Sequence, residues 1–444
     1  MARGRSSDIR SELRKVLPAS VVSALARETG AVQRQRRVRI YDLVWVLVLG
    51  FAVGRKRTLA ALRRRYERTT GQTIEESSFY NRFTPGLAKL LKTLLARAFK
   101  ECLGVGRGLA GPLAAFRDVV LTDSTVIRLH DLLEKRFPAC RTNHTKAALK
   151  AHVIMSVRGV GGQSVKVTAE RRHDGPVFRI GPWVRDHLLM FDLGYFRYQL
   201  FACIGRNGGY FLTRLKGNAD PTIVVVNRVH RGRAISLEGQ RLRDVVPRMQ
   251  RQVLDVEVEV RFQRRRYGGC VHHDTQRLRV VGLLNRETGQ YHLYVTNIPP
   301  DKLAAEDIGV VYALRWQVEL LFSELKSNYR IDDMPSSKRA VVEVLLYAAF
   351  LTMVVSRRLL ALVRRRLRAM ADRIPAQRWA AVFVSVAHEL LAAATQPLAA
   401  VRLLLRNLER VLLHEAVDPN AARHGLLLAV EQRSHRLHPL ASAS

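Results

Sequence analysis

The spacing of apolar residues changes twice along this chain, and that change limits the folds that the chain can adopt. Up to about residue 108, and again after Lys326, apolar residues recur every three or four positions, which is typical of amphipathic helices. Between these regions they fall in short runs rich in β-branched residues, beginning at Val119–Ile127, and such runs predict buried strands. The sequence therefore predicts an α/β core flanked by helical N- and C-terminal regions.

Cap and turn residues divide these regions into individual elements. Thr58 is a candidate N-cap, and Gly71 a stop signal, for a helix at Leu59–Thr69. The other predicted helices are Asp8–Ala26, Tyr41–Val53, Leu87–Leu103, Arg197–Ile204, Arg339–Ala371, Ala376–Ala394 and Pro397–Leu413. The other predicted strands are Ala148–Val157, Ser164–Ala169, Leu188–Tyr195, Tyr210–Leu215, Thr222–Val229, Val253–Phe262, Leu278–Leu284 and His292–Thr296.

These elements predict five parts. In the first, a helix, a turn and a short helix lie close to the basic residues Arg63–Arg65 and Arg82, which favours a DNA-binding region over a plain helical bundle. A strand-dominated block between Asp192 and Glu319 indicates an insertion into the core. The parts are a helical DNA-binding region at 1–108, the first part of the core at 109–216, a β-rich insertion domain at 217–300, a helix completing the core at 301–335, and a helical C-terminal region at 336–444.

The charge of the chain indicates the class of its partner. The sequence has 74 Lys and Arg against 38 Asp and Glu, which gives a net charge of +36. A positive charge of this size, spread over the whole length, predicts a polyanionic partner such as DNA. No single arginine run identifies a contact, because most exposed arginines are simply solvated. Charge alone also fits a non-catalytic DNA-binding regulator, so that alternative stays open.

Cysteine usage and hydropathy predict the compartment. The four cysteines are scattered, which suits a reducing compartment better than a disulfide scaffold. The first residues are charged throughout and do not resemble a signal peptide. The two most apolar stretches, Leu43–Val53 and Val344–Val355, are too short to span a bilayer and predict buried core helices. We therefore expect a cytoplasmic, nucleoid-associated protein with no membrane contact.

The stretch 311–326 contains no glycine or proline and predicts one continuous helix. Its apolar residues fall within a stripe roughly 80° wide, which consists of Val311, Leu314, Val318, Leu321 and Leu325. A second stripe, roughly 60° wide and centred about 110° away, carries Tyr312, Arg315, Glu319 and Lys326. A carboxylate that holds a metal, beside cations that hold phosphates, suits phosphodiester chemistry. The alternative is an ordinary amphipathic helix with an Arg315–Glu319 ion pair.

Three carboxylates lie in otherwise apolar local sequence. Asp123 and Asp192 are placed on predicted strands, and Glu319 on the predicted helix. Three convergent carboxylates can hold two Mg²⁺ ions, with Mn²⁺ as a possible substitute, and Asp123 would most naturally bridge the two. The alternatives are an Asx-turn or strand-end cap for Asp123 and a turn aspartate for Asp192.

These residues resemble the motifs of DDE-class insertion-sequence transposases, in the branch marked by Tyr-x2-Arg-x3-Glu-x6-Lys. Tyr312, Arg315, Glu319 and Lys326 match that spacing without a gap, and Trp316 completes an Arg-Trp-x-x-Glu core. The motifs upstream are Asp123-Ser-Thr, Asp192-Leu-Gly-Tyr-Phe, Thr296-Asn297 and, on the strand between the aspartates, Lys150-Ala-His152. The resemblance covers about 110 to 330.

The resemblance implies a ribonuclease-H-like catalytic core that is interrupted by a β-rich insertion. It implies an enzyme that cleaves DNA at the ends of an insertion sequence and joins the 3′-hydroxyl to target DNA, often through a hairpin. Asp123, Asp192 and Glu319 would be the catalytic metal ligands. Tyr312, Arg315 and Lys326 would hold a phosphate, and Lys150 and His152 would also contact DNA. Trp316 would brace a flipped base, although its position on the helix also allows a place in the core.

The resemblance further implies double-stranded DNA as the partner, both as terminal repeats and as target, and a homodimer that joins two ends. An inactive copy with the same core is the remaining alternative. The sequence does not specify the terminal repeat, the target-site preference or the excision route.

Overall fold

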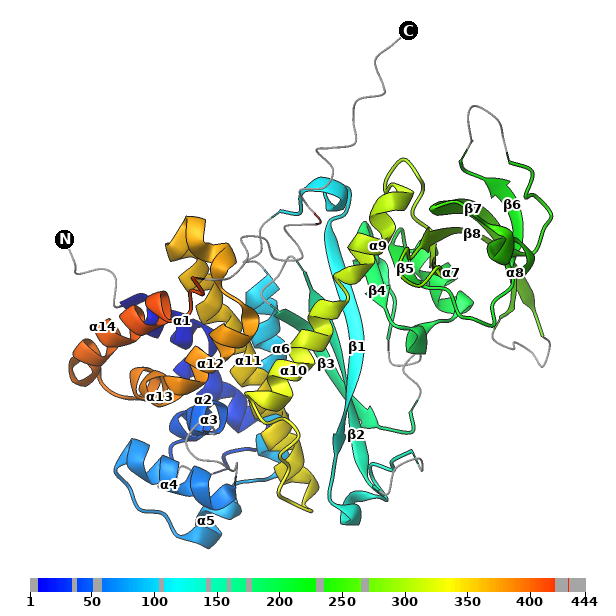
Figure 1. Ribbon diagram of the computed structural model, residues 1–444. Helices are drawn as coiled ribbons and strands as arrows, with labels where there is room; N and C mark the ends of the chain where they lie inside the picture. The colour runs from blue at the N-terminus through cyan, green and yellow to red at the C-terminus, as the bar shows by residue number, and fades with distance from the viewer. Residues whose placement is uncertain are drawn as a thin grey trace.

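A nine-stranded sheet lies beside a body of helices in the computed structural model (Figure 1). The structure describes residues 7–33, 38–50, 58–103, 108–140, 145–157, 161–172, 178–228, 235–264, 271–419 and 430. In Figure 1 the N-terminal helices, in blue, and the C-terminal helices, in orange, lie together on one side of the sheet. The chain is therefore a mixed α/β protein with helical flanks, as the change in apolar spacing predicts.

The sheet has the strand order β3-β2-β1-β4-β5-β9-β8-β7-β6. Strands β1, β4 and β5 are parallel to one another, and every other neighbouring pair is antiparallel. The strands are β1 (Asp118–Arg128), β2 (Ala148–Ser156), β3 (Gly161–Ala169), β4 (His187–Phe191), β5 (Tyr210–Arg214), β6 (Thr222–Val226), β7 (Val253–Gln263), β8 (His273–Leu284) and β9 (Tyr291–Thr296). Residues 229–234 and 265–270 lie outside the described part, and they include the predicted end of the β6 strand.

Strand β4 is apolar after His187 because both faces of the sheet are covered there. Along β4, Leu188 and Met190 belong to the large core that the sheet shares with the helical body. Leu189 and Phe191 point to the opposite face and pack in a second core with α7 (Tyr198–Arg206). A strand buried on both faces shows a continuous apolar run rather than alternation, which explains the sequence of β4.

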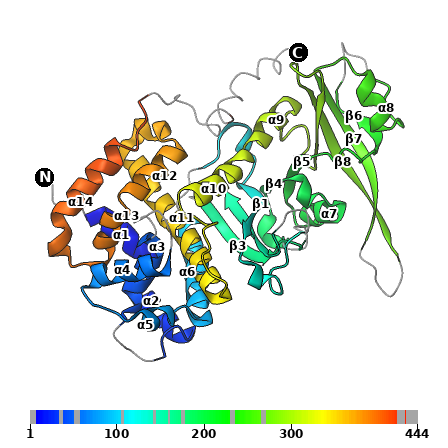
Figure 2. The same ribbon diagram turned by 60° about the horizontal axis from the view of Figure 1, so that its bottom comes forward.

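The strands after β5 extend the same sheet. Strand β9 pairs with β5, and β8, β7 and β6 follow outward from it. Figure 2 shows β7 and β8 as a long ribbon that reaches away from the helical body. The ribbon is longer than the sequence indicates, since β8 begins at His273 and not at Leu278. Its first residues are polar and exposed, so they carry no apolar pattern that could have marked them.

The N-terminal helices are α1 (Ser7–Val16), α2 (Ala19–Glu28), α3 (Ile40–Leu49), α4 (Leu59–Thr70), α5 (Glu76–Tyr80) and α6 (Pro85–Leu103). The helix predicted at Asp8–Ala26 is two helices, because Pro18 cannot continue α1 and instead precedes α2. The predicted caps of α4 are confirmed. The Thr58 side chain accepts a hydrogen bond from the Ala61 backbone N–H, and Gly71 ends the helix at a φ of 69°. The predicted end of α3 at Val53 lies outside the described residues.

The C-terminal helices are α11 (Arg339–Leu367), α12 (Ala376–Ser385), α13 (Ala387–Thr395) and α14 (Leu398–His414). Helix α11 packs against α6, α3 and α1, so the two ends of the chain share one core. Among the described helices only α11 is long and apolar enough to cross a membrane, and 83% of its most apolar stretch is buried. As predicted, α11 and α3 are buried core helices. The single helix predicted at Ala376–Ala394 is interrupted at Val386.

Candidate active site

Strand pairing brings the two aspartates to neighbouring positions. In the parallel pair β1–β4, Thr122 lies opposite Phe191. Asp123, in the middle of β1, and Asp192 each follow one step later. Asp192 was predicted on the strand, but β4 ends at Phe191, and Asp192 lies between it and a short 3-10 turn, Leu193–Tyr195. The carboxyl ends of parallel strands are where α/β sheets place ligands, so Asp192 occupies a position suited to a site, with Asp123 on the neighbouring strand.

The Asp123 carboxylate is half-buried, and its neighbours compensate its charge only in part. Its side chain is 19% exposed, and burial raises its pKa to about 6. The backbone N–H of Ser124 donates to Oδ1 at 2.7 Å, and Arg315 lies nearby; both act to lower the pKa. The neighbouring Asp192 and Glu319 act to raise it. The three predicted carboxylates therefore lie close enough to interact electrostatically, and their negative charge favours a bound cation.

The stretch predicted as one helix is two helices, α9 (Ala305–Ala313) and α10 (Trp316–Ser327). Between them the hydrogen bonds tighten to the 3-10 pattern, because Arg315 and Val318 donate to residues three positions earlier. The prediction of a continuous helix is therefore wrong at this turn. The predicted apolar stripe is nevertheless confirmed, since all five of its residues are buried.

Arg315 connects two of the carboxylates. Its Nη2 atom lies 2.6 Å from Oε1 of Glu319, and its Nη1 atom lies 3.8 Å from Oδ2 of Asp123. Burial acts to lower the Arg315 pKa, but the hydrogen bond to Glu319 and the nearby charges outweigh it, so the pKa is raised. The ion pair that the sequence allowed as an ordinary helix contact therefore exists, and it also reaches Asp123. In this arrangement the arginine supplies the positive charge that the two carboxylates need.

The three remaining predicted residues of this stretch, Tyr312, Trp316 and Lys326, differ in accessibility. The Tyr312 ring is buried against Tyr294, with the ring centroids 5.2 Å apart, and burial raises its pKa. Trp316 is 55% exposed, which excludes the core position that the sequence left open. Lys326 lies in the last turn of α10. It is seven residues after Glu319, which corresponds to about 10 Å along the helix.

Lys150 and His152 lie on β2, beside the first aspartate. Lys150 is half-buried, whereas His152 is 4% exposed and pairs in register with Ser124. The Nδ1 atom of His152 lies 3.3 Å from the Tyr195 hydroxyl, and its Nε2 atom lies 2.9 Å from the Thr168 hydroxyl. The imidazole therefore faces the protein interior and joins β2 and β3 to the turn that follows Asp192.

Two further polar residues near the carboxylates, Thr122 and Arg214, were not predicted. Thr122 precedes Asp123, and its hydroxyl is buried without a hydrogen-bond partner among the described residues. The Tyr312 hydroxyl and the Arg315 Nε atom are buried and unpaired in the same described set. Arg214, the last residue of β5, is close enough to Tyr312 to affect its pKa. Its place at the end of a third parallel strand is the signal that could have identified it.

The donor set fits a hard divalent cation, because three carboxylates supply oxygen ligands. Within the described residues, however, no group of three or more His, Cys, Asp or Glu side chains is arranged to hold a metal ion. The contacts of Arg315 account for this arrangement, since its guanidinium is directed at two of the three carboxylates. The three carboxylates therefore fit a metal ion by their chemistry and charge. In this structure the Arg315 guanidinium balances the charge of Asp123 and Glu319.

Comparisons with known proteins identify the family of the chain. A family model described as a transposase DDE domain matches residues 114–355. The transposase of insertion sequence IS231F from Bacillus thuringiensis subsp. israelensis is 21% identical over 367 residues, which cover 76% of each chain. That of IS231D from Bacillus thuringiensis subsp. finitimus is 22% identical over 393 residues, covering 80% of this chain and 81% of the relative. The transposase of IS1151 from Clostridium perfringens is 17% identical, and 76% of each chain is covered.

One solved structure is similar in overall shape. The cryo-EM structure of a piggyBac transposase synaptic complex with hairpin DNA aligns with a TM-score of 0.44 and 9% sequence identity. The alignment covers 93% of this chain and 86% of that one.

Proposed function

Because the chain belongs to the transposase DDE domain family, we propose that this DNA transposase cleaves DNA at the ends of an insertion sequence and joins them to target DNA. The observation that supports the proposal is the proximity of Asp123, Asp192 and Glu319, since the latter two act on the pKa of Asp123. A cut-and-paste route fits this chemistry, and a hairpin intermediate is one excision route within it.

In this proposal Asp123, Asp192 and Glu319 hold two Mg²⁺ ions, or Mn²⁺ in their place. When bound, such ions activate a water or 3′-hydroxyl and stabilise the leaving oxygen of the phosphodiester. The protein contributes the position of the ligands: β1 and β4 fix the aspartates, and α10 brings Glu319 to them. Arg315 compensates the carboxylates until the site is filled, and its guanidinium can then pair with a DNA phosphate.

The remaining motif residues are proposed to orient DNA. The buried Tyr312 hydroxyl and the Arg315 Nε atom have hydrogen-bonding capacity that a phosphate oxygen would use. The exposed indole of Trp316 can stack on an extrahelical base. Lys326 and the half-buried Lys150 are proposed to contact the backbone further away. For His152, burial supports an indirect role: it would hold the Tyr195 turn that follows Asp192.

The division into parts is also a proposal. The strand order β3-β2-β1-β4-β5 supports a ribonuclease-H-like core built from 109–216 and completed by the catalytic helix region at 301–335. The strands of 217–300 would be the β-rich insertion. Residues 1–108 would bind DNA, and 336–444 would support them. We also propose that the protein forms a homodimer that joins two element ends. We propose a place in the cytoplasm, associated with the nucleoid rather than with a membrane, and the net charge of +36 supports the association with DNA.

Strand cleavage of a labelled duplex that carries the flanking repeats of the element tests the proposed function. We expect nicks at the repeat ends in Mg²⁺ and none in EDTA. Glu319→Gln should abolish cleavage while DNA binding persists, because the substitution removes a metal ligand and leaves the basic surface unchanged. Glu306→Gln on α9 is the matched control, since Glu306 is an exposed acid paired with Arg228, and it should cleave normally.

Binding without cleavage in any divalent metal would contradict the proposal. That result would assign the chain to the alternative class, a non-catalytic DNA-binding regulator or an inactive transposase copy.

A further inference from the structure

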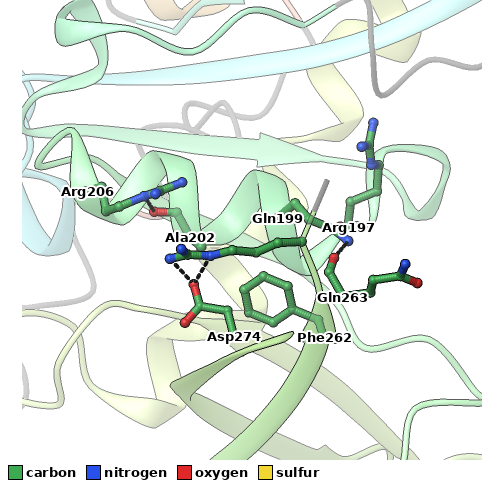
Figure 3. A pocket seen from close by; sticks show the side chains of 8 residues that line it. Arg197, Gln199, Ala202, Arg206, Phe262, Gln263 and Asp274 are labelled. Carbon is green, nitrogen blue, oxygen red and sulfur yellow. Dashed lines mark hydrogen bonds and ion pairs between the residues drawn. The ribbon is translucent and has the colours of Figure 1, made fainter. Parts of the chain in front are cut away.

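A groove of about 760 Å³ lies between α7 and the β7–β8 ribbon, outside the carboxylate site (Figure 3). Helix α7 and the residue before it supply one wall, and the ends of β7 and β8 supply the other. The lining residues are Arg197, Gln199, Ala202, Arg206, Phe262, Gln263, Arg264 and Asp274. All are described, and none belongs to the motifs that the sequence analysis assigned to DNA.

The groove is positively charged. Three of its four ionisable residues are arginines, and all three side chains are exposed. Asp274 neutralises Arg264, with Nη2 and Oδ2 2.6 Å apart. Arg197 and Arg206 form no ion pair with any acidic residue in the described part of the chain, so their charges remain available. Figure 3 shows Arg206 and Arg197 on opposite sides of the view, with Phe262 on the other wall, across from Ala202.

The groove is connected to the candidate active site by the chain itself. Arg197 directly precedes α7 and follows Asp192 by five residues. Between them, Phe196 packs on Phe201, and the ammonium group of Lys216 lies 5.4 Å from the centre of the Phe196 ring. Lys216 and Arg197 therefore lie on or beside the segment that joins the second aspartate to the groove.

The walls of the groove are fixed by packing and hydrogen bonding. Tyr198 of α7 stacks on Phe262 of β7, with ring centroids 6.1 Å apart. The Gln199 side chain donates to the backbone carbonyl of Gln263 at 2.6 Å. Arg197, the N-cap of α7, and Arg206, its last residue, are nine positions apart, so their backbones are separated by about 13 Å along the helix axis. One DNA strand advances about 3.4 Å per phosphate along its axis, so a duplex lying along α7 would present about four phosphates over this length.

From this charge, spacing and continuity we infer that the groove binds the phosphate backbone of duplex DNA next to the cleaved site, with Arg197 and Arg206 as the contacting residues. The inference rests on the proposed function in taking DNA as the partner and the three carboxylates as the place of cleavage. Contacts of this kind set the position of the duplex and carry no sequence preference. The β7–β8 ribbon would then help to hold DNA that leaves the carboxylates.

Duplex binding by the full-length protein in EDTA tests the inference without cleavage. Fluorescence anisotropy with a labelled duplex of arbitrary sequence, at a series of KCl concentrations, gives the affinity and its salt dependence. For Arg197→Ala/Arg206→Ala we expect a loss of affinity of about tenfold or more. The slope of log affinity against log salt should fall by about two, since two phosphate contacts are removed.

The matched control is Arg243→Ala/Arg248→Ala, which removes the same charge from exposed positions outside both the groove and the β7–β8 ribbon. It should change affinity far less and leave the slope nearly unchanged. Equal effects in the two double variants would overturn the inference, because net charge would then explain both. Unchanged duplex binding in the groove variant, with loss of binding to polyglutamate, would assign the groove to an acidic protein segment and also overturn it.

The two proposals fail separately in these assays. If the wild type binds duplex and does not cleave it in any metal, the proposed function fails. The inference about the groove is then still tested by the salt dependence of binding in the groove variant. If the wild type cleaves the duplex and the groove variant binds with the wild-type slope, the inference about the groove fails alone.

Discussion

At the scale of single residues, the candidate site is dominated by Asp123. Its carboxylate is half-buried on the central strand β1 and shares one arginine with Glu319. Burial raises the Asp123 pKa from an ordinary 3.8 to about 6. A carboxyl group with a raised pKa destabilises the fold once it ionises, and a bound metal would reverse that effect.

We expect Asp123→Asn to stabilise the metal-free protein near neutral pH. The folded state binds the Asp123 proton more tightly than the unfolded state, so the burial penalty is absent below about pH 4 and complete above about pH 6. The shift of about two pH units corresponds to at most about 3 kcal/mol, and we expect a gain of about 1–3 kcal/mol. Thermal unfolding of both proteins in EDTA, at about pH 4 and about pH 7, measures it. An equal difference at both pH values would contradict this account.

We expect Tyr195→Phe to weaken the response of cleavage to Mg²⁺. The substitution removes the hydroxyl that contacts His152 and so loosens the turn that follows Asp192. It should cost about 1–3 kcal/mol of stability and raise the Mg²⁺ concentration needed for half-maximal cleavage. Thr168→Val is the control, because it removes the other His152 partner on β3. If both variants raise the required Mg²⁺ concentration equally, the contact between His152 and the Tyr195 turn has no specific effect on the site, and His152 acts only on stability.

At the scale of elements, the helix that carries Glu319 is held from both ends. Upstream, the Arg279–Asp255 pair joins β8 to β7, and Arg279 also donates to the backbone carbonyls of Ile298 and Leu303 in the segment before α9. Downstream, the buried Tyr329 hydroxyl lies 2.7 Å from both Glu324 of α10 and Ser356 of α11. The position of Glu319 therefore depends on strands and helices that are distant in sequence.

We expect Arg279→Met to destabilise the protein by about 3–5 kcal/mol, because Asp255 would remain buried with an unpaired charge. Arg279→Met/Asp255→Leu should recover part of that loss, since no buried charge remains. Chemical denaturation of the wild type and the two variants measures the difference. A double variant less stable than Arg279→Met would show that the backbone contacts of Arg279, and not the ion pair, hold this segment.

At the scale of the whole molecule, the two ends of the chain form one helical body. The N-terminal helix α6 packs along α11, and α3 packs against α13. The hydroxyl of Thr352 on α11 donates to the backbone carbonyl of Val48 in α3. The predicted DNA-binding region is thus supported by helices that begin more than 200 residues later in the sequence.

We therefore expect residues 1–108, produced alone, to lack a stable fold. Their apolar faces would lose the helices that cover them, and exposed patches of that kind favour aggregation. Circular dichroism and thermal unfolding of the fragment, compared with the full-length protein, measure this. A cooperative unfolding transition in the isolated fragment would show that the N-terminal region is independent.

Some features could be predicted from the sequence because they depend on nearby residues. The caps of α4 follow from Thr58 and Gly71, whose chemistry acts within one helical turn. The apolar stripe of the stretch 311–326 also depends only on the spacing of nearby residues, and all of its residues are buried. The break between α9 and α10 was missed, because no proline or glycine marks it. The three carboxylates could also be predicted as candidate site residues, because their motifs follow one another in the sequence in the order typical of the family.

Only the tertiary structure decided how these parts meet. The β1–β4 register places Asp192 beside Asp123, and residues about 70 positions apart in sequence give no local signal of that pairing. The burial of His152, the exposure of Trp316 and the contact of Arg315 with Asp123 all depend on which elements lie against them. Sequence by itself determined the elements and their chemistry, because propensity, caps and spacing act over a few residues. The site and the arginine-lined groove arise from long-range packing, and so they belong to the fold.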